Sequence, residues 1–172
     1  SAFLELVDLH LEASDGERFT RTVVRHPGAV VVVPVVDDDV ILVRQFRAAV
    51  GRSLLEVPAG KRDVEGEAPE TTAARELEEE IGQSPGRLRK LCEFYNSPGF
   101  CDEYTHLYCA TELSALPERH GVTVEEQAMT VERVPLAATG ELIAAGELVD
   151  AKSIIGLLLT QALVAREPDG GR

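Results

Sequence analysis

The 172-residue sequence predicts an α+β fold. Stretches with strand-like alternation or β-branched runs dominate the chain, and turn residues separate them. Helical spacing of apolar residues is confined to mid-chain and to two stretches near the C-terminus, so strands and helices do not alternate regularly. We expect one domain over 1–166, since this length is enough for a proper core, and a disordered tail over 167–172.

The N-terminal region, 1–27, reads as an antiparallel hairpin. Residues 2–12 and 18–26 are predicted strands, because their apolar residues share one face, and Asp15-Gly16 between them is a turn signal. We expect this hairpin to be either a purely structural element or a dimerisation element.

Three further strands precede the middle of the chain. Residues 29–36 form a nearly continuous β-branched run, which predicts a largely buried strand. Pro34 cannot donate to a strand ladder, so we expect a bulge or a sheet edge there. Strand 40–47 follows an acidic turn, and a short strand over 53–60 leads into the central helix region.

A helix is predicted after Pro69, which suits a first helical position, and Gly82 is expected to end it. One face of this predicted helix carries Glu76, Glu79 and Glu80, which are spaced so that all three carboxylates project from the same side within about one turn. A narrow apolar stripe at helical spacing consists of Ala73, Ala74, Leu77 and Ile81.

Three clustered carboxylates suggest a metal site. On a merely solvated face, each like-charged pair would cost about 0.2–0.5 kcal/mol. Arg75 offsets part of this repulsion because it reaches Glu79 four positions on. Oxygen ligands without an accompanying His or Cys suit Mg²⁺ or Mn²⁺ rather than zinc. Taken alone, the pattern also fits a solvated acidic helix face.

The C-terminal half is predicted to contain three strands, two loops and two helices. The strands are 88–95, 104–110 and 129–134, the loops are 96–103 and 116–127, and the helices are 135–145 and 151–166.

The composition of the chain limits the kinds of molecule that it is expected to bind and the compartment in which it is expected to work. The net charge of −13 argues against nucleic acid or an anionic membrane surface as a partner. There is no apolar run long enough to span a membrane and no signal peptide pattern. Three cysteines without metal-ligand spacing are expected to be reduced thiols, which favours a cytoplasmic location.

The central stretch resembles the Nudix box, the signature of Nudix hydrolases. The matching positions are Gly60, Glu67 and the run Arg75-Glu76-Leu77-x-Glu79-Glu80-x-Gly82. The sequence departs from the family pattern in having six residues rather than five between Gly60 and Glu67, and in having Gln83 at a usually aliphatic position. The resemblance implies an α/β/α sandwich around a mixed sheet and cleavage of a nucleoside diphosphate linked to another moiety.

Residues outside the box resemble the ADP-ribose pyrophosphatase branch of the family. The similar segments are 44–47, 55–60 and the loop that contains Pro98, sixteen positions beyond Gly82. This resemblance implies substrate contacts by Arg47, Arg44, Glu56 and Glu103. It implies a metal shell of Glu76, Glu79, Glu80 and the carbonyl of Ala59. It also implies that Arg75 orients Glu79 and pairs with Glu67, and that Glu125 or Glu126 is the general base.

The expected activity is therefore Mg²⁺-dependent hydrolysis of ADP-ribose to AMP and ribose 5-phosphate, with Mn²⁺ as an alternative metal. Two other functions stay open. One is a Nudix pyrophosphatase for another sugar nucleotide such as GDP-mannose, and the other is a non-catalytic nucleotide-binding module. The expected partners are a small-molecule substrate and a second copy of the chain.

Overall fold

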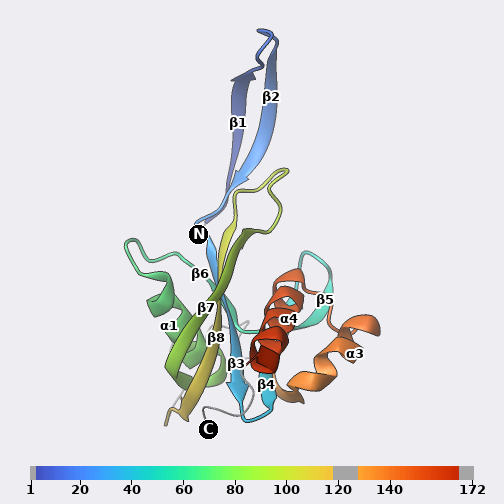
Figure 1. The fold of residues 1–172 in the computed structure, drawn as a ribbon. Coiled ribbons are helices and arrows are strands. Elements are labelled where there is room, and N and C mark those ends of the chain that lie inside the picture. The colour runs from blue at the N-terminus through green and yellow to red at the C-terminus, as the bar shows by residue number, and fades with distance from the viewer. Residues whose placement is uncertain (1–2, 118–127, 167–172) are drawn as a thin grey trace.

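A computed structural model describes residues 3–117 and 128–166 (Figure 1). The strands are β1 (Glu5–Glu12), β2 (Arg18–Arg25), β3 (Ala29–Val36), β4 (Asp39–Arg47), β5 (Arg52–Glu56), β6 (Ala59–Lys61), β7 (Gln83–Tyr95), β8 (Tyr104–Ala115) and β9 (Thr130–Pro135). The helices are α1 (Pro69–Ile81), the short 3₁₀ helix η1 (Leu136–Ala138), α3 (Thr139–Ala144) and α4 (Ala151–Arg166).

Strand β3 is the centre of a mixed sheet. The strand order is β5-β4-β3-β8-β7, with β6 also paired to β3 and β9 to β4. The β3–β8 pairing is parallel, whereas the other pairings in this sheet are antiparallel. On its other edge, β3 pairs with β6 through Ala29–Val31 and with β4 only from Val35 onward. Pro34 lies where the strand changes partner, so its missing N–H removes no bond to β6 or β4.

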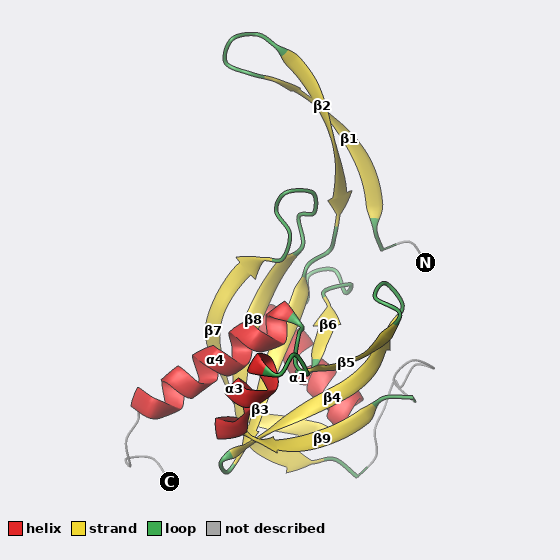
Figure 2. Ribbon diagram, turned by 90° about the vertical axis from the view of Figure 1, so that its right-hand side faces the viewer, coloured by secondary structure: helices red, strands yellow, loops and turns green. Residues whose placement is uncertain are grey.

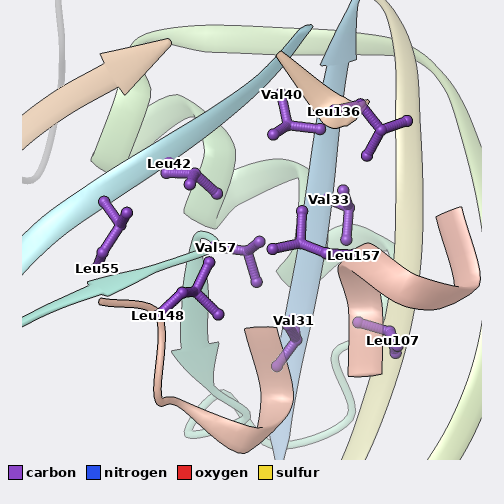
Figure 3. Packing of buried hydrophobic residues seen from close by; sticks show 10 residues of the cluster. All are labelled: Val31, Val33, Val40, Leu42, Leu55, Val57, Leu107, Leu136, Leu148 and Leu157. Atoms are coloured by element: carbon purple, nitrogen blue, oxygen red, sulfur yellow. The ribbon is translucent and has the colours of Figure 1, made fainter. Parts of the chain in front are cut away.

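Alternation along β3 builds two cores. Val30 and Val32 point to the face covered by α1, and Val31 and Val33 point to the face covered by α4. All four are fully buried, and burial of one such side chain contributes about 1.5–3 kcal/mol. Figure 3 shows the α4 side, where Leu157 packs against the β3 valines. This arrangement confirms the expected sandwich of helices around a mixed sheet.

The N-terminal hairpin stands apart from this sandwich (Figures 1 and 2). Strands β1 and β2 form a two-stranded sheet of their own, as predicted. At its base, the Val24 N–H donates to the Phe100 carbonyl at 2.7 Å, and Arg25 forms an ion pair with Asp102 at 2.7 Å. A hairpin of this kind is marginally stable in water on its own. Its exposed apolar side chains and those just before it include Leu4, Leu6 and Leu11.

Several strands differ from their predicted extent, and β8 continues to Ala115, five residues beyond the predicted end at 110. The predicted strand 53–60 is divided at Val57-Pro58 into β5 and β6, because the Val57 N–H bonds to the Ser153 hydroxyl instead of a strand. Strand β7 begins at Gln83 rather than 88, although Pro85 lies within it. Pro85 is tolerated because β7 is the edge strand of the sheet. The tail over 167–172, predicted to be disordered, lies outside the described residues.

None of the helices in the described parts of the chain is long and apolar enough to cross a membrane.

Candidate active site

Helix α1 supplies most of the charged side chains of the site. It begins at Pro69 and ends at Gly82, which has φ +66° and donates its N–H to the Glu78 carbonyl, so both predicted ends are confirmed. The buried face includes Glu76 and Glu80, which are only 7% and 4% exposed. Carboxylates this deeply buried are not a solvated helix face, and they require partners.

Arg75 holds two of the clustered carboxylates. One of its terminal nitrogens, Nη1, lies 2.9 Å from Oε1 of Glu76 and 3.0 Å from Oε2 of Glu79. The other, Nη2, lies 3.5 Å from Oε2 of Glu67. Burial opposes the charge of Arg75, but the charges of Glu76 and Glu79 outweigh it and raise the pKa of the guanidinium. The expected contacts of Arg75 with Glu79 and Glu67 are therefore both present.

The loop before α1 absorbs the additional residue between Gly60 and Glu67. It turns at Gly66, which has φ +77°, and the Glu67 N–H donates to the Val64 carbonyl at 3.2 Å. Glu67 then accepts a hydrogen bond of 2.7 Å from the Thr72 hydroxyl. This bond and the neighbouring Arg75 lower the pKa of Glu67. The longer loop thus still delivers Glu67 to Arg75.

Gly60 lets the loop approach the carboxylates closely. A Cβ at this position would lie 1.9 Å from Cδ of Glu76 and within 2.2 Å of both its oxygens. Next to it, the Ala59 N–H donates to Oε2 of Glu80 at 3.1 Å. Only a glycine therefore allows Glu76 and the Ala59–Gly60 backbone to face each other across this gap.

The chemistry of these donors fits a hard divalent cation. Glu76, Glu79 and Glu80 offer carboxylate oxygens, and Ala59, which lines the same pocket, would offer a carbonyl oxygen. In the arrangement described, Arg75 and the Ala59 N–H engage these carboxylates. Within 3–117 and 128–166, no three acidic, His or Cys side chains are already gathered as a metal site. The fit to a hard cation therefore rests on the chemistry of these donors.

Arg47 enters the site from the end of β4. Its Nε donates a hydrogen bond to Oε1 of Glu56 and its Nη2 donates one to Oε2, both at 2.7 Å. The Glu56 side chain is 1% exposed, whereas that of Arg47 is 39% exposed. These bonds raise the pKa of Arg47 despite its partial burial. Glu56 thus lies beneath the site and orients a guanidinium that faces it.

Apart from Glu56 and Glu67, the charged side chains described above for this site line one pocket of about 510 Å³. Of the predicted site residues, it brings together Arg47, Ala59, Arg75, Glu76, Glu79, Glu80 and Glu103. Residues of the lining that sequence reasoning did not single out are Phe3, His26, Ala29, Gln45, Lys61, Asp63 and Lys152. A positively charged residue at the start of a predicted helix, as at Lys152, carries no signal that the helix reaches a site formed elsewhere.

Two predicted site residues from the described parts of the chain, Arg44 and Glu56, are not in this lining. Arg44 forms a bidentate ion pair with Glu132 on β9, with its Nε at 2.6 Å, and Glu56 lies below the pocket floor. Their contact with substrate remains a prediction. Glu125 and Glu126 lie outside the described residues.

Known proteins resemble this chain in sequence and in fold. The sequence model of the NUDIX domain matches residues 25–152. An ADP-ribose pyrophosphatase from Bacillus subtilis (strain 168) is 41% identical over 95% of this chain and 91% of its own length. One from Mycobacterium tuberculosis is also 41% identical, over 84% of this chain and 70% of its own. A GDP-mannose pyrophosphatase from Klebsiella pneumoniae is 34% identical over 76% and 69%.

A solved structure, described as an ADP compounds hydrolase, superposes with a TM-score of 0.83 over 97% of this chain and 94% of its own, at 24% identity. The fold is therefore the Nudix fold. The chain belongs to the NUDIX family, as a hydrolase similar to ADP-ribose pyrophosphatases. Members of this family generally use divalent metal ions.

Proposed function

We propose that this protein hydrolyses ADP-ribose to AMP and ribose 5-phosphate with Mg²⁺ as its metal. The observation that carries the proposal is the presence in one pocket of the box carboxylates and of Arg47. A cluster of carboxylates suits a metal-bound diphosphate, and a guanidinium suits phosphate oxygens. The 41% identity to two ADP-ribose pyrophosphatases supports this choice of substrate over another sugar nucleotide.

The reaction is attack of water on one phosphorus of the diphosphate. The new P–O bond forms as the bond to the bridging oxygen breaks, and that oxygen leaves with the other phosphate. Glu76, Glu79, Glu80 and the Ala59 carbonyl would hold Mg²⁺, which neutralises the diphosphate and polarises the water when bound. Arg75 orients Glu79, and Arg47 binds phosphate oxygens that gain charge.

The water must lose its proton to a base. We propose Glu125 or Glu126 for this role, because both acids fall in the predicted loop 116–127, and a carboxylate on such a loop can reach a bound substrate from outside the sheet. The assignment is made by changing each to Gln separately, since only the variant that lacks the base should lose most of its kcat. If both variants keep their activity, the base lies elsewhere, and the box itself becomes the next place to search.

The proposal is tested with a panel of nucleoside diphosphate derivatives, with phosphate release measured after phosphatase coupling, with Mg²⁺ and with EDTA. We expect ADP-ribose to give the highest kcat/KM and EDTA to abolish turnover. If GDP-mannose is hydrolysed faster than ADP-ribose, the proposed substrate is wrong but the proposed type of reaction still holds. Absence of turnover on the whole panel would support the non-catalytic nucleotide-binding module instead.

We further propose that the protein is a homodimer through its N-terminal hairpin. The hairpin forms a sheet of its own, in which Leu6 is 75% exposed, and Leu4 just before it is 45% exposed. Burying such side chains against a second copy would supply the stability that a lone hairpin lacks. Sedimentation should give twice the chain mass, and a mass near 18.6 kDa would contradict the dimer.

A further inference from the structure

The beginning of helix α4 reaches the floor of the pocket. Lys152, in the first turn of the helix, lines the pocket with a side chain that is 21% exposed. Its Nζ donates a hydrogen bond of 2.6 Å to Oδ1 of Asp150 and lies 4.0 Å from Oε2 of Glu56. One ammonium group thus faces two carboxylates, one of them fully buried.

The same corner also holds the backbone that leads to Ala59. Oδ2 of Asp150 accepts hydrogen bonds from both the N–H and the hydroxyl of Ser153, at 2.9 and 2.7 Å. The Ser153 hydroxyl in turn accepts the Val57 N–H at 2.9 Å. Asp150 is therefore fixed in place by bonds that do not involve Lys152, and replacing the lysine would leave this carboxylate where it is.

The charges in this corner balance in pairs. Arg47 binds Glu56 through two hydrogen bonds, and Lys152 binds Asp150. Burial alone would raise the pKa of Asp150, but the charge of Lys152 and the hydrogen bonds from Lys152 and Ser153 outweigh it, so the pKa lies below its usual range. Without Lys152, an unbalanced carboxylate would remain under a pocket that must attract an anion.

We propose that Lys152 is a positioning residue for the reaction. Its ammonium group neutralises the charge of Asp150 and part of the charge of Glu56. The positive charge of Arg47 is then not cancelled by these two acids and remains available to the substrate diphosphate. This role rests on the proposed function, since it presupposes an anionic substrate. It requires no contact between Lys152 and the reacting atoms.

The test compares Lys152→Met and Lys152→Arg with Lys90→Met. The control removes the same charge at a lysine that pairs with Glu93 on β7, outside the pocket lining. Lys152→Met should raise KM about tenfold with kcat within about threefold, as expected for one lost charge near the substrate. Lys152→Arg should restore most of the affinity, and Lys90→Met should match the wild type. A Lys152→Met variant that behaves like the control would overturn the proposal.

A double variant separates neutralisation from direct contact. Asp150→Asn with Lys152→Met removes both charges, while an amide at 150 can still accept the bonds from Ser153. If Lys152 acts by neutralising Asp150, the double variant should bind substrate within about threefold of the wild type. If it is as weak as Lys152→Met alone, the ammonium group contacts the substrate directly and the proposal is wrong. If Lys152→Met alone is too unstable to assay, the double variant is compared directly with the wild type, and weak binding by the double variant would still contradict the proposal.

Affinity is also measured without turnover, by calorimetric titration of ADP-ribose in EDTA. This readout separates the two proposals. A wild type that hydrolyses nothing in the panel refutes the proposed activity. A tenfold difference in affinity between Lys152→Met and the double variant would still support the role of Lys152. Equal affinities for ADP-ribose among all the variants would overturn that role, whatever the activity.

Discussion

The guanidinium of Arg47 donates two hydrogen bonds of 2.7 Å to the carboxylate of Glu56. The Glu56 side chain is buried beneath the pocket, whereas the Arg47 side chain is partly exposed within it. Arg44, three residues earlier on β4, makes a similar bidentate pair with Glu132, but both of its members are more than a third exposed. One strand thus carries two pairs of the same chemistry in different surroundings.

We expect the two pairs to differ in their contribution to stability. Arg47→Met leaves the Glu56 carboxylate buried without its main partner and should lower the free energy of unfolding by about 2–3 kcal/mol. Glu56→Gln should cost about 1 kcal/mol, because the guanidinium that remains can reach water. Arg44→Met, the matched control, should cost under about 1 kcal/mol. Urea unfolding measures all three, and equal losses for Arg47→Met and Arg44→Met would contradict this reasoning.

Gly60→Ala should damage the site more than the fold. The added Cβ would force the Glu76 carboxylate to move, and a displacement of about 1 Å in a catalytic constellation can cost about a hundredfold in rate. We expect kcat/KM to fall at least by that factor while the far-UV CD spectrum stays the same. The control is Gly140→Ala, where a Cβ meets nothing within 4 Å. Full activity of Gly60→Ala would show that the gap between loop and helix is not needed.

Glu80→Gln should abolish most of the turnover without unfolding the protein. The amide oxygen can still accept the Ala59 N–H, so the loop stays attached to α1. The loss of a charged ligand for the metal should lower kcat about a hundredfold or more. Glu78→Gln, on the same helix but outside the pocket lining, is the control. Steady-state kinetics with a CD melt measure both effects, and an active Glu80→Gln variant would remove Glu80 from the metal shell.

Asp150 should make the stability depend on pH in the acid range. Its pKa is lowered in the folded protein, where Lys152 and Ser153 contact it and Arg47 and Glu56 lie nearby. The stabilisation is therefore complete above the unfolded-state pKa of about 4 and is lost as pH falls through the folded value. In urea titrations below about pH 4, the slope of unfolding free energy against pH should be smaller in Asp150→Asn than in the wild type. Identical slopes would contradict this.

The strongest sequence signals were those with a local physical cause. Pro69 and Gly82 set the ends of α1 because their backbone preferences act without tertiary structure. The partner of Arg75 four residues on, Glu79, also follows from helix geometry alone. These features, together with the strand alternation of β3, made the core of the fold and half of the site predictable.

Features that depend on distant segments could not be predicted in this way. Nothing local indicates that Lys152 approaches Glu56, since the two are brought together only when α4 packs across the sheet. For the same reason, the pairing of Arg44 with Glu132 could not be predicted, because it depends on the register between β4 and β9. The start of β7 at Gln83 rather than 88 could not be predicted either, because the edge position that tolerates Pro85 is not known before the strand order.

The parallel pairing of β3 with β8 has a consequence for how the molecule folds. Ala29 lies beside Thr105, so the entire box is contained in the loop that this pairing closes. Closing so long a loop lowers the entropy of the chain before the contacts between the two strands can stabilise it. We therefore expect this pairing to form slowly. Helix α4, which supports the pocket floor, is the last described element to leave the ribosome. The box is therefore synthesised well before α4, and the pocket that both elements line cannot be complete until α4 has also been synthesised.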